Sequence, residues 1–406
     1  MMDIRVFVVV GLFICHQQAV GETSLRHRRA TVLSLSTSSF GTSLYKRLAS
    51  GSHDNIIFSP FSVYTALTMT LLGAGGDTER QLKTALGVQE GQNIHAGIHN
   101  LLTSITGHDA ASNVTLRVAD AVYYDAQQVH VTDSFASNMS QYYGEGLKPF
   151  QRPNPEQAIN TWVEEVTEGA ITNFLQPGAI TADTVLMLLN AVFFEASWQT
   201  MFEPTSSRHI GFTTLSGAIK QVSTMYKEGR FSVKNVPELD ARVLELPYRG
   251  GHYSFFILLP MTKNGLPRLE GLLNGQSVEN VVRVMPSPTD LAVFLPKFTM
   301  RVRKGLKEPL QALGLKNMFD TTANFTAMAR ATGGRNILVS DVQHEAMIEV
   351  TESGTKAAAV TSVGFQAESV PQTFRVDHPF IFILRDKVDG LNLFMGRLAD
   401  PTQGGQ

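Results

Sequence analysis

The fold is decided by one stretch near the end of the chain, EVTESGTKAAAVTSVGFQAESVPQTFRVDHPF, which runs from Glu349 to Phe380. It begins like a strand, continues through a long run of small residues, and leads into the apolar run Pro379 to Leu384. A flexible linker would have a similar composition. However, no proline occurs between Glu349 and Val370, and three consecutive alanines have β-branched neighbours, which favours a segment able to become a strand.

Alternate positions of this stretch differ in charge. One parity is uncharged and mostly small, and consists of Thr355, Ala357, Ala359, Thr361 and Val363. The other parity holds the only charge, and consists of Lys356, Ala358, Val360, Ser362 and Gly364. Alternate residues of a strand face the same side, and a buried face excludes unpaired charge. The first parity could therefore be buried while the second faces outward.

The bulk composition excludes several classes of function. The chain has 406 residues and a formal net charge of -2, from 34 basic and 36 acidic side chains. Such a length can bury a large core without disulfides or metals. The balanced charge does not favour binding to nucleic acid or to a membrane surface.

The N-terminus has the pattern of a secretory signal peptide. Arg5 precedes the apolar run Val6 to Cys15, and Ala19-Val20-Gly21 is a small-x-small cleavage pattern. We predict a signal peptide over residues 1–21 and a secreted product, because the run is too short for the alternative, a membrane anchor. The single cysteine lies in this peptide, so the mature chain would contain none.

The mature chain is expected to begin with a flexible segment over residues 22–35 and to carry glycans. Three Asn-x-Ser/Thr sequons, none with a central proline, are candidate acceptors in a secreted chain: Asn113, Asn138 and Asn324.

Helical and strand patterns alternate irregularly along the chain. Helical spacing over Phe61 to Leu72 stops at Gly73-Ala74-Gly75-Gly76, and a second helix is expected up to Leu86, capped by Asp77 or Thr78 and closed by Gly87. Strand-like runs follow at Leu186–Trp198, Tyr253–Pro260, Leu291–Met300 and Asn336–Thr351. A helix-rich first half and a strand-rich second half indicate an α+β fold with large sheets.

Motifs of catalysis and metal binding are missing. There is no G-x-S-x-G elbow and no phosphate-binding loop, and Ile348 stands where a zincin helix starting at His344-Glu345 would need its second histidine. His95 and His99 lie four residues apart with no evident third ligand, and zinc sites need at least three. We expect no enzyme activity, no metal and no cofactor.

Four motifs, in order, resemble those of the serpin family: NIIFSPFSVYTALTMTLLGAGGDTERQL at Asn55–Leu82, LLNAVFFEASW at Leu188–Trp198, HEAMIEVTESGTKAAAV at His344–Val360, and DHPFIFILRD with LFMGRLADP near the C-terminus. The general style is also similar to that of secreted arthropod serpins. The resemblance covers Phe40 to Pro401. It implies one domain over residues 36–402, with three β-sheets, about nine helices and an exposed reactive-centre loop near the C-terminus, at 349–378.

The resemblance also implies roles for particular residues. The hinge that inserts into the main sheet after cleavage would be Glu352, Gly354, Thr355, Ala357, Ala358, Ala359 and Thr361. The conformational residues would be the polar cluster where the central strands part, formed by Ser59, Ser62, Asn190 and His344, and the tryptophan at the top of the opening, Trp198. Counts from Glu352 and from Phe380 along the family's loop length both place the reactive bond between Glu368 and Ser369. An acidic residue there departs from the Arg, Lys, Leu, Met or Phe of familiar members.

The function implied is that of a suicide-substrate inhibitor, whose partner is a serine protease held in a covalent complex. The carboxylate of Glu368 favours an acid-preferring protease, because a trypsin-like pocket already holds an aspartate. The alternative is a non-inhibitory serpin acting as a carrier or binding protein, which the small, uncharged hinge disfavours. Residues 91–106 contain no Lys or Arg, so heparin binding there is not expected, although Arg301, Arg303, Lys304 and Lys307 form a second basic cluster. We expect a monomer.

Overall fold

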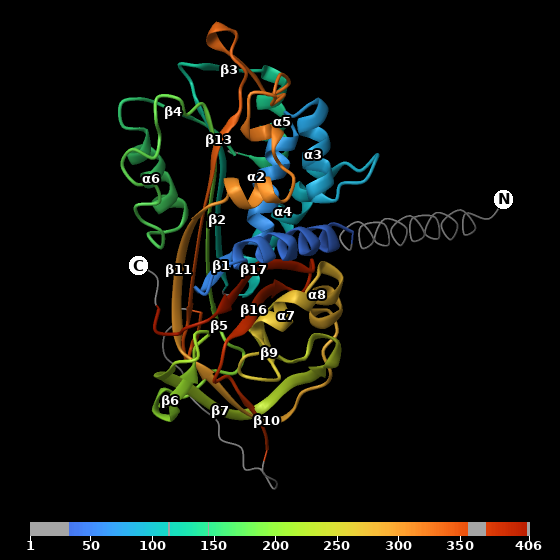
Figure 1. Cartoon of the computed structure of the whole chain (residues 1–406), viewed down its shortest axis with the longest axis vertical. Coiled ribbons are helices and arrows are strands. Elements are labelled where there is room, and N and C mark those ends of the chain that lie inside the picture. The colour runs from blue at the N-terminus through green and yellow to red at the C-terminus, as the bar shows by residue number, and fades with distance from the viewer. Residues whose placement is uncertain (1–31, 113, 145, 356–370, 404–406) are drawn as a thin grey trace, which may run out of the picture.

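A six-stranded sheet runs along the long axis of the molecule (Figure 1). The computed structural model describes residues 32–112, 114–144, 146–355 and 371–403. In spatial order the strands are β11 (Phe298–Gly305), β13 (Val339–Val350), β14 (Gly354–Thr355), β5 (Leu186–Ser197), β2 (Thr115–Asp125) and β4 (Leu147–Phe150). The central strands β5 and β13 pair directly and run parallel to each other along most of their length.

Both faces of this sheet are covered, which explains the continuous apolar run of β5. Leu188 and Val192 belong to the main hydrophobic core, on the side of α2. Met187 and Leu189 belong to a smaller core beneath α6. A strand buried on both faces needs apolar residues at both parities, so no alternation is visible in its sequence.

The remaining strands form two further sheets. A nine-stranded sheet consists of β1 (Ile56–Phe58), β17 (Leu391–Leu398), β16 (Phe380–Asp386), β9 (Tyr253–Pro260), β8 (Ala241–Pro247), β7 (Ile219–Val236), β10 (Thr289–Pro296) and β15 (Gln372–Arg375), with β6 (Arg208–Thr213) paired to β7. A two-stranded sheet joins β3 (Val129–Val131) to β12 (Ala329–Ala331). Strand β15, which lies within the segment 349–378 expected to be an exposed loop, pairs in parallel with β10.

The described residues contain nine α-helices. One spans residues 32–49. The others are α2 (Pro60–Leu71), α3 (Gly76–Leu86), α4 (Ile94–Ser112), α5 (Asp133–Tyr143), α6 (Pro155–Val166), α7 (Leu266–Leu272), α8 (Gly275–Val282) and α9 (Lys307–Ala312). Short 3-10 helices lie at Pro204–Ser206, Pro237–Leu239, Asn317–Phe319 and Thr332–Gly334. In Figure 1, α6 lies on one side of the six-stranded sheet and α2 to α5 on the other.

The expected α+β fold, one domain with three sheets and about nine helices, is confirmed in the described residues. Helix α2 begins where Ser59 Oγ accepts a hydrogen bond from the Ser62 amide, and Gly87, at φ 64°, closes α3. The expected cap of α3 is wrong, because the cap is Gly75, and Thr78 Oγ1 instead accepts a hydrogen bond from the Asn324 amide.

Two other boundaries differ from expectation. The run Leu291 to Met300 is divided at Lys297 between β10 and β11, which belong to different sheets. Residues 32–35, expected to be flexible, form the first turn of a helix in which Leu33 and Ser34 are buried. Residues 1–31, with the predicted signal peptide, lie outside the described residues. No helix of the described part combines the length and apolar character needed to span a bilayer.

Candidate functional site: the hinge and the opening of the central sheet

The hinge enters the six-stranded sheet as the short strand β14. Thr355 lies opposite Val350 of β13 on one side and opposite Ala196 of β5 on the other. Strand β14 is antiparallel to both neighbours. Strands β13 and β5 are parallel to each other where they pair directly, from Val339 opposite Leu186 to Met347 opposite Phe193. The pair of central strands is therefore parted at one end only, and the hinge occupies the gap.

Gly354 is required at its position by a close backbone approach. A Cβ atom added there would lie 2.1 Å from the carbonyl oxygen of Ala196, and the residue adopts φ 149°, which favours glycine. The absence of a side chain is what allows the hinge to reach β5.

Trp198 holds the hinge through two hydrogen bonds. Its backbone amide donates to the Ser353 carbonyl at 3.0 Å, and its indole Nε1 donates to the Thr351 carbonyl at 2.9 Å. The indole ring stacks on Tyr248 with centroids 4.5 Å apart. The Tyr248 hydroxyl lies 2.8 Å from the Thr355 hydroxyl, and both side chains are fully buried. Tyr248, which the sequence did not single out, thus joins the ring stack to the inserted residue.

Glu352 is fixed just before the inserted strand. The Ser207 hydroxyl donates to its carboxylate at 2.6 Å, and Lys297 Nζ lies 3.0 Å away. Partial burial opposes ionisation, but these donors and the lysine charge hold the pKa of Glu352 below its ordinary value. The backbone amide of Phe202 donates a hydrogen bond to the Glu352 carbonyl at 2.9 Å. Glu352 thus connects the hinge to Lys297, just before β11, and to Phe202, in the segment after β5.

A buried polar cluster lies farther down, where the central strands are paired. His344 of β13 lies directly opposite Asn190 of β5. The Ser59 amide donates to His344 Nε2 at 3.1 Å, which leaves the proton on Nδ1, and Nδ1 donates to Asn190 Oδ1. Asn190 Nδ2 is hydrogen-bonded to Ser62 Oγ, so the four expected residues are brought together.

A fifth member, Asp120 of β2, was not identified from the sequence. Its Oδ1 accepts hydrogen bonds from the Ser62 hydroxyl and from Asn190 Nδ2. The residue as a whole is partly exposed, but Oδ2 is buried and has no hydrogen-bond partner among the described residues. A signal existed: Asp120 shares the parity of Leu116 and Val122, two buried residues of the main core.

Burial shifts both titratable groups of the cluster toward their neutral forms. It lowers the pKa of His344 to about 3, although the bond to Asn190 acts in the opposite direction. It raises the pKa of Asp120 to about 8, against the hydrogen bonds from Ser62 and Asn190. At neutral pH the cluster is therefore uncharged, which suits its buried position.

The second basic cluster is largely occupied by contacts within the protein. Arg301 and Arg303 of β11 both form ion pairs with the fully buried Glu345 of β13, and they donate to the carbonyls of Thr172 and Asn173. Two of the four members of this cluster, Arg301 and Arg303, thus already have partners within the protein. The stretch without basic residues, 91–106, lies mostly in α4.

The other candidate residues have separate positions. His95 Nδ1 is 2.7 Å from the Tyr143 hydroxyl and His99 Nδ1 is 3.2 Å from the Tyr142 carbonyl, and the described residues contain no cluster of three potential metal ligands. Asn138 lies in α5, and Asn324 lies in an irregular segment where its Oδ1 accepts a hydrogen bond from the Thr326 hydroxyl; both residues are half-buried. The following residues lie outside the described part of the chain: Asn113, Ala357, Ala358, Ala359, Thr361, Glu368 and Ser369.

Comparisons with known proteins identify the family. The family model described as "Serpin (serine protease inhibitor)" matches residues 35–401. The leukocyte elastase inhibitor of Sus scrofa is 34% identical over 91% of this chain and 99% of its own, and Ipis-1 of Ixodes persulcatus is 33% identical over 89% and 97%. The native thermophilic serpin tengpin superimposes with a TM-score of 0.82 at 27% identity, over 90% of this chain and 94% of its own. The chain belongs to the serpin family.

Replacing Asp120 by Asn should change how stability depends on pH. The folded-state pKa of Asp120, about 8, lies above the model-compound value of 3.8, so the folded chain retains a proton that the unfolded chain has lost between these values. The stability contribution of Asp120 therefore falls as pH rises through this window. We expect Asp120→Asn to remove this decline. The urea concentration at the unfolding midpoint should then be higher for the variant than for the unmodified protein, and the difference should be largest above pH 8.

The measurement is urea unfolding from pH 5 to pH 9, with the exposed Asp290→Asn as the matched control. If the unfolding midpoints of Asp120→Asn and the unmodified protein change with pH in parallel, the Asp120 carboxyl is not the cause of the pH dependence of stability.

Replacing Gly354 by Ala should expel the hinge from the sheet. The clash with the Ala196 carbonyl adds to the backbone strain, which is on the order of 1 to 3 kcal/mol. We expect faster hydrogen exchange at the amides of Trp198 and Phe202, which donate to the hinge carbonyls. Gly217→Ala is the control, because Gly217 has φ 87° but no atom within 4 Å of an added Cβ. Equal exchange in both variants would mean that the close approach is unimportant.

Proposed function

We propose that this protein is a secreted suicide-substrate inhibitor of serine endopeptidases, with its reactive bond between Glu368 and Ser369. The observation that carries the proposal is the two-residue insertion of β14 between β13 and β5. An inserted strand that is antiparallel to both neighbours can be extended without reversing its direction. Membership of a family described as serine protease inhibitors and the similarity to a leukocyte elastase inhibitor support the same function.

The register of β14 predicts where each loop residue would arrive. Thr355 lies opposite Val350 and Ala196, so extension of both registers by six residues would bring Thr361 opposite His344 on one side and Asn190 on the other. Residues opposite each other in a sheet point to the same face. Ala357, Ala359 and Thr361 would thus enter the main core, and Lys356 would face the side of α6.

Insertion must break the bond between His344 and Asn190, because a new strand would separate β13 from β5. Neighbouring strands lie roughly 4.8 Å apart, so the two would come to lie about 10 Å apart. A hydroxyl both donates and accepts hydrogen bonds. The Thr361 hydroxyl could therefore accept from His344 Nδ1 or donate to Asn190 Oδ1. It would then replace the bond that these two side chains lose on insertion.

The chemistry follows from the bond that is attacked. The protease serine Oγ would attack the carbonyl carbon of Glu368, an ester would form, the bond to Ser369 would break, and the Ser369 amine would leave with a proton from the protease's base. Residues 356–368, at about 3.3 Å each in a strand, would then carry the acyl-enzyme about 40 Å along the sheet. The downstream fragment would remain bound through β15 and the strands that follow it.

The driving free energy would come from new strand pairing. A strand between β13 and β5 replaces one ladder of hydrogen bonds by two. With about a dozen inserted residues at roughly 0.5 to 1.5 kcal/mol net per bond, the gain is on the order of 10 kcal/mol. This is comparable with the whole stability of a typical domain.

The direct test is incubation with acid-, Arg- and aromatic-preferring serine proteases. We expect an SDS-stable complex with an acid-preferring enzyme, and a C-terminal fragment that begins at Ser369 and separates from the rest of the chain only in SDS. Glu368→Arg should transfer complex formation to a trypsin-like enzyme, because that pocket holds an aspartate. In the matched variant Thr355→Arg, whose side chain could not occupy a fully buried position, cleavage should continue without a complex. Cleavage without a complex for every protease would contradict the proposal.

The arrival of Thr361 at the polar cluster has its own test. Thr361→Val removes the hydroxyl but keeps the shape, so the loop-cleaved form should lose about 1 to 3 kcal/mol for each buried group left without a partner. The uncleaved form should be unaffected. Thermal unfolding of both forms measures this difference, with Ser362→Ala, on the opposite parity, as the control. If cleaved Thr361→Val is as stable as the cleaved unmodified protein, the predicted register is wrong.

A further inference from the structure

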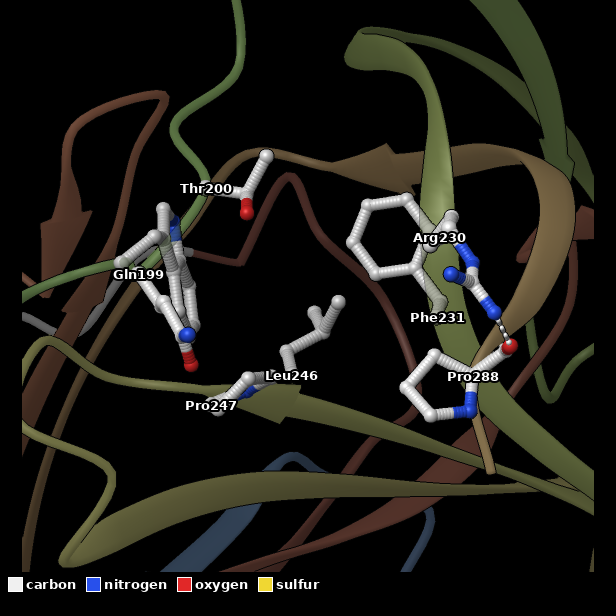
Figure 2. A pocket seen from close by; sticks show the side chains of 8 residues that line it. Gln199, Thr200, Arg230, Phe231, Leu246, Pro247 and Pro288 are labelled. Carbon is white, nitrogen blue, oxygen red and sulfur yellow. Dashed lines mark hydrogen bonds between the residues drawn. The ribbon is translucent and has the colours of Figure 1, made fainter. Parts of the chain in front are cut away.

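A cavity of about 110 Å³ lies behind Trp198, between the end of β5 and the strands β7, β8 and β10. Its floor is apolar and buried, made by Trp198, Phe231 and Leu246. The side chains of Gln199, Thr200 and Arg230 line it as well and belong to exposed residues. Figure 2 shows Gln199 and Thr200 across the space from Phe231 and Arg230, with Leu246 and Pro247 below them. An apolar floor with a polar rim is the usual form of a small-molecule site.

The charged group at the rim is the guanidinium of Arg230, which forms no ion pair with a carboxylate of the described residues. Arg230 donates one hydrogen bond, from Nη2 to the Pro288 carbonyl at 2.9 Å. Asp290 lies opposite Arg230 in the sheet, but no ion pair joins Arg230 to any carboxylate of the described residues. A guanidinium has five N–H donors, so Arg230 retains enough of them to bind a carboxylate through two hydrogen bonds.

The size of the cavity limits the ligand to one ring. An engineered apolar cavity of about 150 Å³ in another protein holds benzene. The present cavity is smaller, but it opens at a polar rim, so a ring could lie on the floor while a charged group projects to Arg230. The rings of Trp198 and Phe231 favour an aromatic over a saturated ring.

We propose that this cavity is a binding site for small aryl carboxylates, at which the ligand ring contacts Trp198 and the carboxylate binds Arg230. The position gives the site a connection to the hinge, because Trp198 donates both its backbone and its indole N–H to hinge carbonyls. A ligand that binds only when Trp198 is in this position stabilises, by mass action, the conformation in which Trp198 holds the hinge. The inference concerns binding alone and does not depend on protease inhibition.

The test uses benzoate as the probe and the full chain without any protease. The sequence contains two tryptophans, so Trp162→Phe leaves Trp198 as the sole indole reporter. Ligand-observed NMR measures binding, and Trp198 fluorescence reports its location. We expect saturable benzoate binding in the millimolar range with a change in fluorescence, and about tenfold weaker binding of benzamide, which has the ring without the charge.

The matched variants are Arg230→Met and Arg283→Met, since Arg283 is also exposed but does not line the cavity. Arg230→Met should weaken benzoate binding about tenfold and abolish the preference over benzamide, whereas Arg283→Met should change neither. Cyclohexanecarboxylate should bind more weakly than benzoate. The proposal is overturned by an absence of saturable binding, by equal binding of benzoate and benzamide, or by an Arg230→Met variant that binds benzoate unchanged.

Discussion

The structure depends on the parallel pairing of β5 with β13. Because these two strands point in the same direction, a third strand between them can be antiparallel to both, and β14 already is. Both faces of the pair are covered, by the main core on one side and by α6 with its following segment on the other. Whatever enters between them must therefore present small, uncharged side chains on the core face, which is the pattern of Thr355, Ala357, Ala359 and Thr361.

Under the proposed mechanism, the polar cluster gives this pairing a bond that an inserting strand would break and replace. An apolar contact between β5 and β13 would hold them together without regard to what comes between them. The bond between His344 and Asn190 is directional, and it lies on the line that an entering strand would follow. Burial keeps both His344 and Asp120 neutral at physiological pH, so parting the strands does not have to move a buried charge.

At the open end the hinge is held by aromatic rings and backbone hydrogen bonds together. The stack of Trp198 on Tyr248 places an indole N–H and a hydroxyl at successive points of the hinge. The same indole forms the floor of the cavity beside Arg230. The side chain of Trp198 thus contacts both the hinge and the cavity, so a ligand bound as we propose would act on the same residue that holds the hinge.

The sequence by itself determined the class of fold, the positions of the helices α2 and α3 and of the strands β5, β9 and β13, and the two parities of the hinge, because periodicity and glycine or proline positions act locally. It also indicated Ser59, Ser62, Asn190 and His344 through their motifs. It did not identify Asp120 or Tyr248, because the parity of Asp120 in β2 indicated only a face of the strand, and both residues join these groups through strands far apart in the chain. It showed a basic cluster that includes Arg301 and Arg303, but not that the tertiary structure pairs both with Glu345. The depth of hinge insertion, the neutral state of the cluster and the cavity behind Trp198 were decided by tertiary packing, because burial and long-range contacts set each of them.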